Sequence, residues 1–348
     1  MDLIRQSDPF IIAEDCAGLA TVSAAVQGLQ AEKVIRGSVR VAFLSEVDKE
    51  LRELLELQHQ HHSHVPLILA DIFDSAPNGA QLQRVHLYAC GFPCQPESTM
   101  GKEMRGRDAR ALPVQAMLSY IKFGRPLSCL LEYVSGFTRT RRFKQLCRSL
   151  EDFGYVVHTR VLNTRDITSI PHCRTRLYIV AFLACVARNP GQFEWPSESP
   201  PQTLTSAILD LSLPMGPAPV TKTAKRNLDH AFAYLTSGVG AVNLEPFHSI
   251  VDLQASNGRE QCRVEYSPCI TKARASAKAF HIIRNRDVTQ TREVSLKEYS
   301  RMQGWSDDMY EFRCRRLRDT LHASALGNGM TLGVVQRVVA RMLPHITW

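Results

Sequence analysis

The chain has 348 residues, of which 44% are hydrophobic and 22% charged, a composition typical of a folded protein long enough for two domains. Its 19 glycines and 18 prolines form no repeat, which excludes collagen-like, solenoid and low-complexity classes. The longest apolar run, residues 177–187, is shorter than the ~20 residues that span a bilayer, and no basic-then-apolar leader begins the chain. We therefore expect no membrane insertion or secretion, and ten cysteines without a CxxC pair indicate reduced intracellular thiols.

The formal charge of +8 is unevenly distributed along the chain. Residues 1–96 carry 7 Lys and Arg against 12 Asp and Glu, whereas residues 97–148 carry 11 against 4. A basic segment of this kind is typical of proteins that bind a polyanion such as nucleic acid, although solvated basic helices are also common. Charge alone does not identify the partner.

Apolar runs of strand length alternate with amphipathic segments of helix length through the first half of the chain. The predicted strands cover residues 10–16, 39–44, 66–72, 85–89, 127–131, 155–162 and 177–184, and the predicted helices cover 21–30, 49–59, 111–123 and 139–153. Because these strands are too apolar to be half exposed, we expect a parallel, doubly wound sheet with helices on both faces. The predicted fold class is α/β.

The composition changes near residue 188. Seven prolines fall within residues 190–219, and the alternation of strands and helices stops there. Residues 220–300 are predicted to be irregular, with short β-like pieces such as residues 279–283. Gly327-Asn328-Gly329 then precedes an amphipathic helix over 332–342, which suits packing back onto the first domain. The predicted organisation is a Rossmann-like domain at 1–187, a smaller domain at 188–318 and a returning C-terminal segment at 319–348.

Polar residues follow three of the predicted strands. The first strand ends in the turn Glu14-Asp15-Cys16-Ala17-Gly18-Leu19-Ala20, where a glycine lets a ligand approach the backbone and the next helix start favours an anion. Glu46 ends the second strand, 28 positions after Gly18, where an acid can accept hydrogen bonds from ribose hydroxyls. Asp71 ends the third. Any α/β protein can contain one such turn, but three polar strand ends at one edge predict a site for an adenosine-bearing cofactor.

The fourth and fifth predicted strands end in residues suited to covalent chemistry. The fourth ends in Gly91-Phe92-Pro93-Cys94-Gln95-Pro96, where the prolines fix the direction of the cysteine and favour a nucleophile over a buried, unreactive thiol. Glu132 ends the fifth strand at the same edge, where a partly desolvated carboxyl can protonate a ring nitrogen. A solvated glutamate is the plainer alternative. The polar loop at 98–110 is predicted to act as a lid.

Taken in order, these segments resemble the motifs of the cytosine-C5 methyltransferase family over nearly the whole chain. Residues 15–20, 46 and 71 resemble the cofactor motifs, 91–95 the Pro-Cys-Gln block, 98–110 the catalytic loop, 132–134 the Glu-Asn-Val block, 170–176 the Pro-Gln-x-Arg-x-Arg segment, 292–305 the late block and 327–328 the last block. No single tripeptide is decisive, but eight or more blocks in the same order are very specific.

The resemblance implies a Rossmann-like S-adenosylmethionine-dependent methyltransferase fold with a smaller, irregular target-recognition domain. Cys94 would add to C6 of a cytosine flipped out of duplex DNA, Glu132 would hold N3 and the exocyclic amine, and Arg174 and Arg176 would lie around the base O2. The basic stretch at 102–148 would lie along phosphates. The implied cofactor contacts are Asp15, Cys16, Ala17, Gly18, Leu19, Glu46, Asp71, Ile72 and Asn328.

Several positions depart from the family pattern. Cys16 replaces the usual aromatic residue beside adenine and Ala20 replaces a glycine, which predicts weaker cofactor binding. Glu97 replaces a phenylalanine near the nucleophile, Tyr133 an asparagine and His172 a glutamine. These changes are compatible with a low intrinsic activity or with an altered substrate. No metal is expected, because the histidine run at 59–64 lacks Cys or Asp at ligand spacing.

The leading hypothesis is a DNA cytosine-C5 methyltransferase, because Cys94, Glu132, Arg174 and Arg176 are all present. One alternative is an RNA enzyme, especially one acting on tRNA, although the Cys-Phe-Thr block of such members is absent. The other is a degenerate member that binds nucleic acid or regulates a partner without turnover. The expected location is intracellular, in the nucleus of a eukaryote or the cytoplasm of a prokaryote. The sequence identifies no protein partner.

Overall fold

The computed structural model describes residues 8–60, 64–75, 84–92, 112–200, 202–237, 247–256 and 262–348. The chain divides into two compact units. The larger unit contains Met1–Leu162, Thr175–Ser197 and Leu332–Trp348, and the smaller unit contains Asn163–Arg174 and Glu198–Thr331. These bounds differ from the sequence-based bounds at 188 and 318. A change of composition marks where a proline-rich connection begins, whereas compact units are defined by packing.

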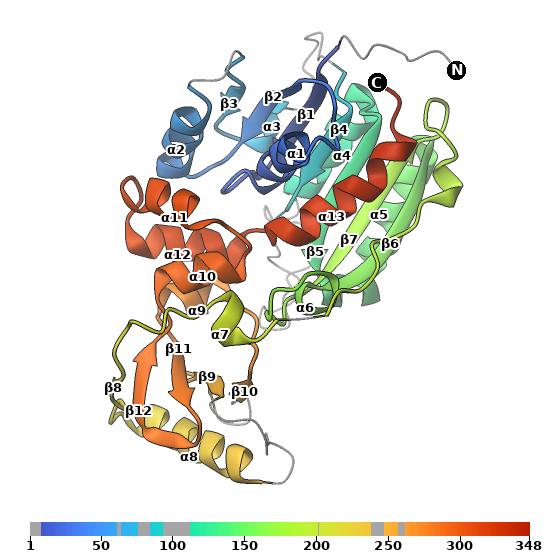
Figure 1. Ribbon diagram of the computed structural model, residues 1–348. Helices are drawn as coiled ribbons and strands as arrows, with labels where there is room; N and C mark the ends of the chain where they lie inside the picture. Colours follow the sequence, from blue (N-terminus) through green and yellow to red (C-terminus); the bar gives the residue numbers. More distant parts are fainter. Residues whose placement is uncertain are drawn as a thin grey trace. The chain divides into compact units, whose positions relative to one another are not determined.

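The described strands of the larger unit form one seven-stranded sheet in the order β3-β2-β1-β4-β5-β7-β6 (Figure 1). They are β1 (Phe10–Asp15), β2 (Val39–Ser45), β3 (Leu67–Leu69), β4 (Leu87–Cys90), β5 (Ser128–Val134), β6 (Tyr155–Asn163) and β7 (Thr175–Leu183). Parallel pairing joins β3 to β2, β2 to β1, β1 to β4 and β4 to β5. The α/β fold expected from the apolar strands is confirmed.

One strand departs from the expected parallel arrangement. β7 pairs antiparallel with β5, so that Glu132 lies opposite Tyr178 and Val134 lies opposite Arg176. The expectation of an entirely parallel sheet is therefore wrong at this position. Buried strands have the same continuous apolar pattern whether they pair parallel or antiparallel, so the pattern carries no information about strand direction.

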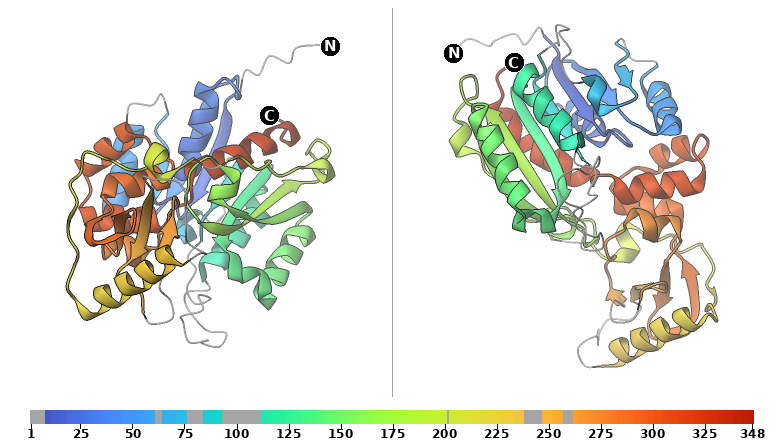
Figure 2. Two further views of the ribbon diagram at one scale, coloured as in Figure 1. Left: turned by 60° about the horizontal axis from the view of Figure 1, so that its bottom comes forward. Right: turned by 180° about the vertical axis from the view of Figure 1, so that it is seen from behind.

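Helices cover both faces of this sheet. The helices are α1 (Thr21–Ala31), α2 (Lys49–His59), α3 (Ile72–Ser75), α4 (Leu112–Gly124), α5 (Arg141–Asp152) and α13 (Leu332–Met342), with the 3-10 turns η2 (Ser135–Arg139), η3 (Pro190–Gln192) and η4 (Leu343–His345). α1 and α13 pack against each other on one face (Figure 1), and α4 and α5 cover the opposite face (Figure 2, right). Tyr88, Tyr120 and Leu146 belong to the hydrophobic core between the sheet and α4 and α5.

The smaller unit contains a second sheet, of which the sequence indicated only the β-like piece at 279–283. Its strands are β8 (Gly216–Pro217), β9 (His248–Asp252), β10 (Cys262–Val264), β11 (Phe280–Arg284) and β12 (Asp287–Glu293), in the order β10-β9-β11-β12-β8. Neighbouring strands of this sheet pair antiparallel. The prediction of an irregular region at 220–300 is therefore wrong. β12 is mostly polar and exposed, so it lacks the apolar run by which the other strands were found.

Helices complete the smaller unit. They are α6 (Thr164–Ile167), α7 (Leu204–Ala207), α8 (Lys222–Thr236), α9 (Lys272–Ser276), α10 (Leu296–Met302), α11 (Asp307–Cys314) and α12 (Asp319–Asn328). α8 packs on the five-stranded sheet through Leu228, Val251 and Ile283 (Figure 2, left). Gly327 belongs to the last turn of α12 and does not begin α13. Glycine is needed there because a Cβ would lie 2.5–2.7 Å from backbone atoms of Thr271 and Lys272.

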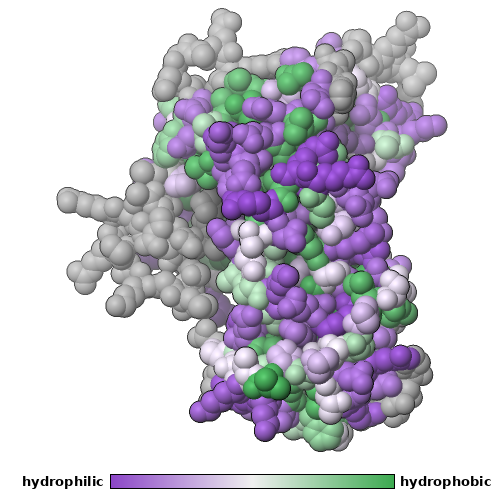
Figure 3. All heavy atoms as spheres, turned by 90° about the vertical axis from the view of Figure 1, so that its left-hand side faces the viewer, coloured by the Kyte–Doolittle hydropathy of each residue, from purple (hydrophilic) through white to green (hydrophobic). Residues whose placement is uncertain are grey.

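On the face drawn in Figure 3, hydrophilic side chains predominate and hydrophobic side chains are interspersed among them. No helix in the described part of the chain is long and apolar enough to cross a membrane.

His86 gives the larger unit a pH-dependent contribution to stability. Its Nδ1 accepts a hydrogen bond from the Ile11 N–H at 2.8 Å, and its ring stacks on Phe10. Burial, with help from Arg84 and Arg40, lowers the pKa of His86 to about 4. Unfolded histidine takes up a proton near pH 6.5, so the unfolded chain binds more protons between these values. The stabilising contribution is therefore present at neutral pH and is lost as the pH falls towards 4.

Replacing His86 by asparagine should retain the hydrogen-bond acceptor and remove the titration. Between pH 7 and pH 4.5, the stability of the wild type relative to His86→Asn is expected to fall by about 1–2 kcal/mol, a value reduced to allow for the partial exposure of the ring. Urea titrations of both proteins across this range measure the difference. A difference that does not change with pH would contradict the neutral, buried imidazole.

Candidate active site

The turn between β1 and α1 has an unusual backbone. Cys16, Gly18 and Ala20 have φ angles of 53°, 54° and 53°, which lie in the left-handed region. A Cβ built on Gly18 would have no heavy atom within 4 Å, so there is open space beside the turn. The N–H groups of Cys16, Ala17 and Gly18 donate to the Ser45 Oγ, the Ser45 carbonyl oxygen and the Glu46 Oε2, so the turn is braced against the end of β2. The open space beside Gly18 leaves room for the close approach of a ligand, at the place where the sequence predicts a nucleotide-type cofactor. Ala17 and Leu19 are buried under this turn.

The first turn of α1 binds an anionic group of the protein itself. Glu14 is 1% exposed, and its carboxylate accepts hydrogen bonds from the backbone N–H groups of Val22 at 3.2 Å and Ser23 at 3.1 Å. Burial raises the pKa of Glu14 to about 7, although these hydrogen bonds oppose the shift. The expectation that an anionic ligand group would lie at this helix start is thus corrected, because Glu14 bonds these donors.

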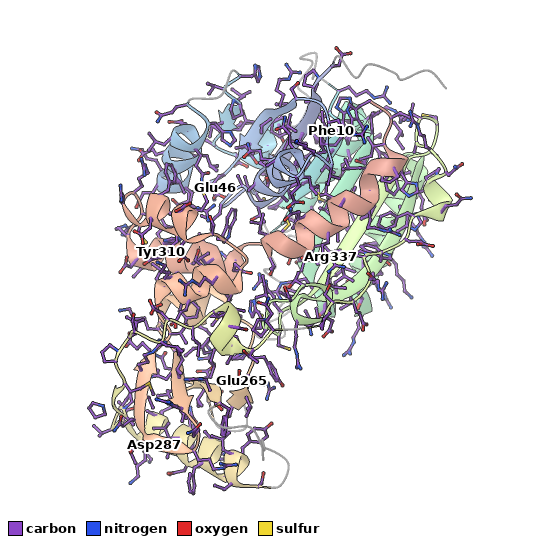
Figure 4. The ribbon with its side chains drawn as sticks, in the orientation of Figure 1. Phe10, Glu46, Glu265, Asp287, Tyr310 and Arg337 are labelled. Carbon is purple, nitrogen blue, oxygen red and sulfur yellow. The ribbon has the colours of Figure 1, made fainter. Side chains whose placement is uncertain are left out.

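Glu46 follows β2 and connects it with the glycine turn. Its Oε2 accepts a hydrogen bond from the Gly18 N–H at 2.8 Å, and its Oε1 accepts one from the Asp48 N–H at 3.0 Å. Glu46 is labelled in Figure 4. Asp71 lies two residues beyond β3, is exposed and accepts a hydrogen bond from the Phe73 N–H at 3.1 Å, while Ile72 begins α3 and is buried. These residues stand at the carboxyl edge, where the sequence predicted them.

The order of the strands reverses between β1 and β4. From β1 the chain continues to β2 and β3 on one side of the sheet, whereas β4 and β5 lie on the other side. In open α/β sheets ligands bind outside the carboxyl ends of the strands at such a reversal. The glycine turn follows β1, and Gly91 and Phe92 follow β4. The fold therefore brings the expected cofactor turn and the start of the expected nucleophile block to the same place.

The expected nucleophile, Cys94, lies outside the described residues, as do the loop at 98–110 and residues 61–63 of the histidine run. Phe92 is described and is 3% exposed. Its ring stacks on Tyr133, with centroids 4.3 Å apart and an interplanar angle of 18°, and Tyr133 packs edge-on against Phe137. The tyrosine that replaces the family's asparagine thus helps to anchor the chain two residues before Cys94.

Glu132 and Arg176 form an ion pair at the end of β5. The Arg176 Nε lies 3.1 Å from the Glu132 Oε1, and the side chains are 16% and 8% exposed. The antiparallel register explains this contact. Since Glu132 lies opposite Tyr178, Arg176 is its diagonal neighbour on the same face of the sheet. A parallel β7 would have placed Arg176, at the start of the strand, at the other edge.

Arg174 belongs to the smaller unit and has a different environment from Arg176. It is 2% exposed, and its guanidinium donates hydrogen bonds to the carbonyl oxygens of Ile270 at 2.7 Å, Gly327 at 3.2 Å and Gly329 at 2.7 Å. This arrangement favours a structural role for Arg174 over the expected contact with a base. The two arginines of the resembling segment therefore lie in different environments, although they are two positions apart.

His172 and Asn328 also belong to the smaller unit. The buried His172 ring accepts a hydrogen bond from the Ile270 N–H at its Nε2, and its Nδ1 lies 3.0 Å from the Met302 carbonyl oxygen. These two bonds explain how histidine serves in place of the family's glutamine. Asn328 ends α12 and is exposed, whereas the other expected cofactor residues belong to the larger unit.

Sequence reasoning missed three buried hydroxyl groups beside the expected cofactor residues. Ser45, Ser75 and Tyr88 donate hydrogen bonds to the carboxylate of Asp15. Serine at the end of the second apolar strand was a visible signal, but Ser75 and Tyr88 are distant in sequence and gave none. Among the described positions, no group of three or more His, Cys, Asp or Glu residues is placed to hold a metal ion.

The fold and these residues define an α/β protein with a candidate ligand site at the carboxyl edge of its larger sheet. A family model described as C-5 cytosine-specific DNA methylase matches residues 14–343, and the chain belongs to this family. The fold agrees with solved structures. The Entamoeba histolytica methyltransferase EhMeth has a TM-score of 0.65 at 13% identity over 97% of this chain and 98% of that one. The Dnmt2 methyltransferase of S. pombe has a TM-score of 0.58 at 15% identity over 96% and 99%.

Curated relatives are bacterial type II methyltransferases. The chain is 33% identical to M.HaeII of Haemophilus aegyptius over 44% of this chain and 45% of that protein. It is 24% identical to M.SsoII of Shigella sonnei over 73% of this chain and 62% of that protein. The matches thus span less than two thirds of the length of these relatives.

Proposed function

We propose that the chain is an S-adenosylmethionine-dependent DNA cytosine-C5 methyltransferase. The observation that carries the proposal is the buried Glu132–Arg176 ion pair, which lies at the carboxyl edge of β5, next to the strand that leads to Cys94. Membership of the C-5 cytosine-specific DNA methylase family supports the same chemistry. The turn at 16–20, Glu46, Asp71 and Ile72 would hold the cofactor, which supplies an electrophilic methyl group when it is bound.

The reaction needs help because C5 of cytosine is a poor nucleophile. Addition of the Cys94 thiolate to C6 forms a carbon–sulfur bond and moves the ring electron pair to C5, which can then accept the methyl group. Loss of the C5 proton to a base breaks the bond to Cys94 and restores the aromatic ring. The target cytosine must leave the base stack to be reached, at a cost of a few kcal/mol.

Glu132 would stabilise the ring during the addition. Its carboxyl group would hold a proton at N3 and accept a hydrogen bond from the exocyclic amine, so that electrons can flow away from C6. Arg176 would keep the carboxylate oriented, since its guanidinium lies 3.1 Å away and both side chains are largely buried. The low exposure of this pair strengthens the interaction by excluding water.

The partner proposed for this site is DNA. On α5, Arg141, Lys144 and Arg148 are exposed and recur at the three- and four-residue spacing that places them on one helix face. Within the described ranges, no carboxylate forms an ion pair with these three cations. They are therefore available to phosphates. The smaller unit is proposed to recognise the nucleotide context of the target.

Incubation with labelled S-adenosylmethionine and either unmethylated DNA or tRNA tests the proposal. We expect label on DNA, at C5 of cytosine. Label on tRNA alone would replace the DNA assignment with RNA methylation. Label on neither, with the cofactor still bound, would indicate a member without turnover.

A covalent trap tests the role assigned to Cys94. DNA containing 5-fluorocytosine has no removable proton at C5, so the adduct should accumulate on the wild type and migrate slowly in a denaturing gel. Cys94→Ser is expected to give no adduct, because the hydroxyl is far less nucleophilic than a thiolate. Cys147→Ser on α5 is the matched control and should trap as the wild type does. Equal trapping by Cys94→Ser would show that another group attacks C6.

A further inference from the structure

Asp15 forms a buried hydrogen-bonded network at the end of β1. Its carboxylate is 0% exposed and accepts hydrogen bonds from the hydroxyls of Ser45 at 2.5 Å, Ser75 at 2.9 Å and Tyr88 at 2.6 Å. The Ser75 hydroxyl shares its proton between Asp15 and the Ile72 carbonyl oxygen, which lies 2.7 Å away. All three donors are buried as well. Each comes from a different element, namely β2, α3 and β4. One carboxylate therefore joins four segments of the larger unit.

Three of these segments carry or adjoin residues of the proposed cofactor site, and the fourth, β4, leads to the proposed nucleophile block. Ser45 precedes Glu46, and its Oγ also accepts a hydrogen bond from the Cys16 N–H at 3.3 Å. Its carbonyl oxygen accepts one from the Ala17 N–H at 2.8 Å. α3, which holds Ser75, begins directly after Asp71. β4, which holds Tyr88, leads to Gly91 and Phe92. The network thus lies directly behind the site.

Stability of the fold does not by itself explain this network. Among the residues that the structure describes, no cation pairs with Asp15, so its charge is compensated by hydroxyl dipoles only. Burial raises the pKa of Asp15 to about 6, and the three hydroxyl groups oppose that shift. An apolar side chain of similar size would usually stabilise a buried position of this kind better than an unpaired carboxylate. The loss of stability is explained if the network fixes the geometry of a binding site.

We propose that Asp15 is a positioning residue, which holds the ends of β1, β2 and β4 and the start of α3 in the arrangement that binds the cofactor, without touching the cofactor itself. This inference rests on the proposed function. It replaces the direct cofactor contact that the family resemblance implied for Asp15, because the observed carboxylate is buried and bonded to three hydroxyls.

Calorimetry that measures the Kd of S-adenosylmethionine for the full chain tests the proposal. Asp15→Asn keeps the size of the side chain but presents an NH₂ group to one or two hydroxyl donors. We expect its Kd for the cofactor to rise at least tenfold, with a matching rise in KM for the cofactor and a kcat at saturation within about threefold of the wild type. Ser75→Ala removes one of the hydrogen bonds to Asp15 and should raise the Kd by a smaller factor. In the double variant the two effects should be less than additive.

A matched variant separates positioning from general loss of stability. Ser128→Ala removes another buried hydroxyl, which donates to the His86 carbonyl oxygen at the opposite edge of the same sheet. It should leave the cofactor Kd unchanged even where its melting temperature falls. An unchanged Kd in Asp15→Asn, or equal rises in Kd in Asp15→Asn and Ser128→Ala, would overturn the proposal. Cofactor binding without methyl transfer by the wild type would contradict the proposed function alone, since the Kd comparison needs no turnover.

Discussion

Glu132→Gln is expected to lower kcat for methyl transfer by about 10³-fold, within the 10²–10⁴-fold range usual for loss of a general acid. Glutamine has nearly the shape of glutamate and keeps an oxygen towards Arg176, but it cannot give a proton to N3. The change should therefore act on the addition step. KM for the cofactor should change by less than about threefold, because Glu132 lies outside the proposed cofactor site. Single-turnover assays with labelled cofactor measure the rate.

Glu151→Gln is the control for this variant. Glu151 lies in α5, is exposed and should tolerate the same chemical change without loss of rate. The trap with 5-fluorocytosine gives a second measurement, since Glu132→Gln should form the covalent adduct slowly. Adduct formation at the wild-type rate would contradict the role of Glu132 in activating the ring, whatever its effect on the overall reaction.

Arg174→Met is expected to destabilise the smaller unit by about 3–5 kcal/mol. Methionine fills part of the volume but leaves the carbonyl oxygens of Ile270 and Gly327 without their arginine donor and that of Gly329 with only the Gln303 amide at 3.2 Å. Each buried unsatisfied group costs about 1–3 kcal/mol. Because these carbonyls belong to one unit, its amides should lose protection from hydrogen exchange while those of the seven-stranded sheet keep theirs.

Urea unfolding together with hydrogen exchange measures this effect. Arg284→Met is a suitable control, because Arg284 is an exposed arginine of the same unit. The family resemblance places Arg174 beside the base, and the comparison distinguishes the two roles. A stable Arg174→Met variant that binds cofactor normally but has lost methyl transfer would support the role at the base and contradict the structural one.

The larger unit could be predicted well because its signals are local. Helices at 49–59 and 332–342 have the bounds that their apolar periodicity predicted, and the strands carrying Asp15 and Glu132 were found from short apolar runs. The carboxyl edge of a parallel sheet then placed Glu46 and Asp71 on the same side as the glycine turn. This much follows from period, length and topology alone.

The rest depended on contacts between distant residues. The Glu132–Arg176 pair requires an antiparallel β7, and strand direction leaves no mark on a uniformly apolar run. Arg174 has the same residue type as Arg176, so that only its burial among the carbonyls of Ile270 and Gly329 distinguishes it. Of the five-stranded sheet, the sequence indicated the β-like piece that forms β11, whereas β12 is mostly exposed and polar and has no apolar run. The order of the strands cannot be read from neighbours in sequence.

The chain passes between its two compact units at four points, so the smaller unit is assembled from two stretches that are separated in sequence. Exchange of the smaller unit among relatives must respect this arrangement. A cassette limited to Glu198–Thr331 would bring the carbonyl acceptors of Arg174 without the arginine itself, so these acceptors would have to pair with the recipient's residue at that position. A chimaera that also carries Asn163–Arg174 keeps donor and acceptors from the same parent, and is the version to build when specificity is to be transplanted.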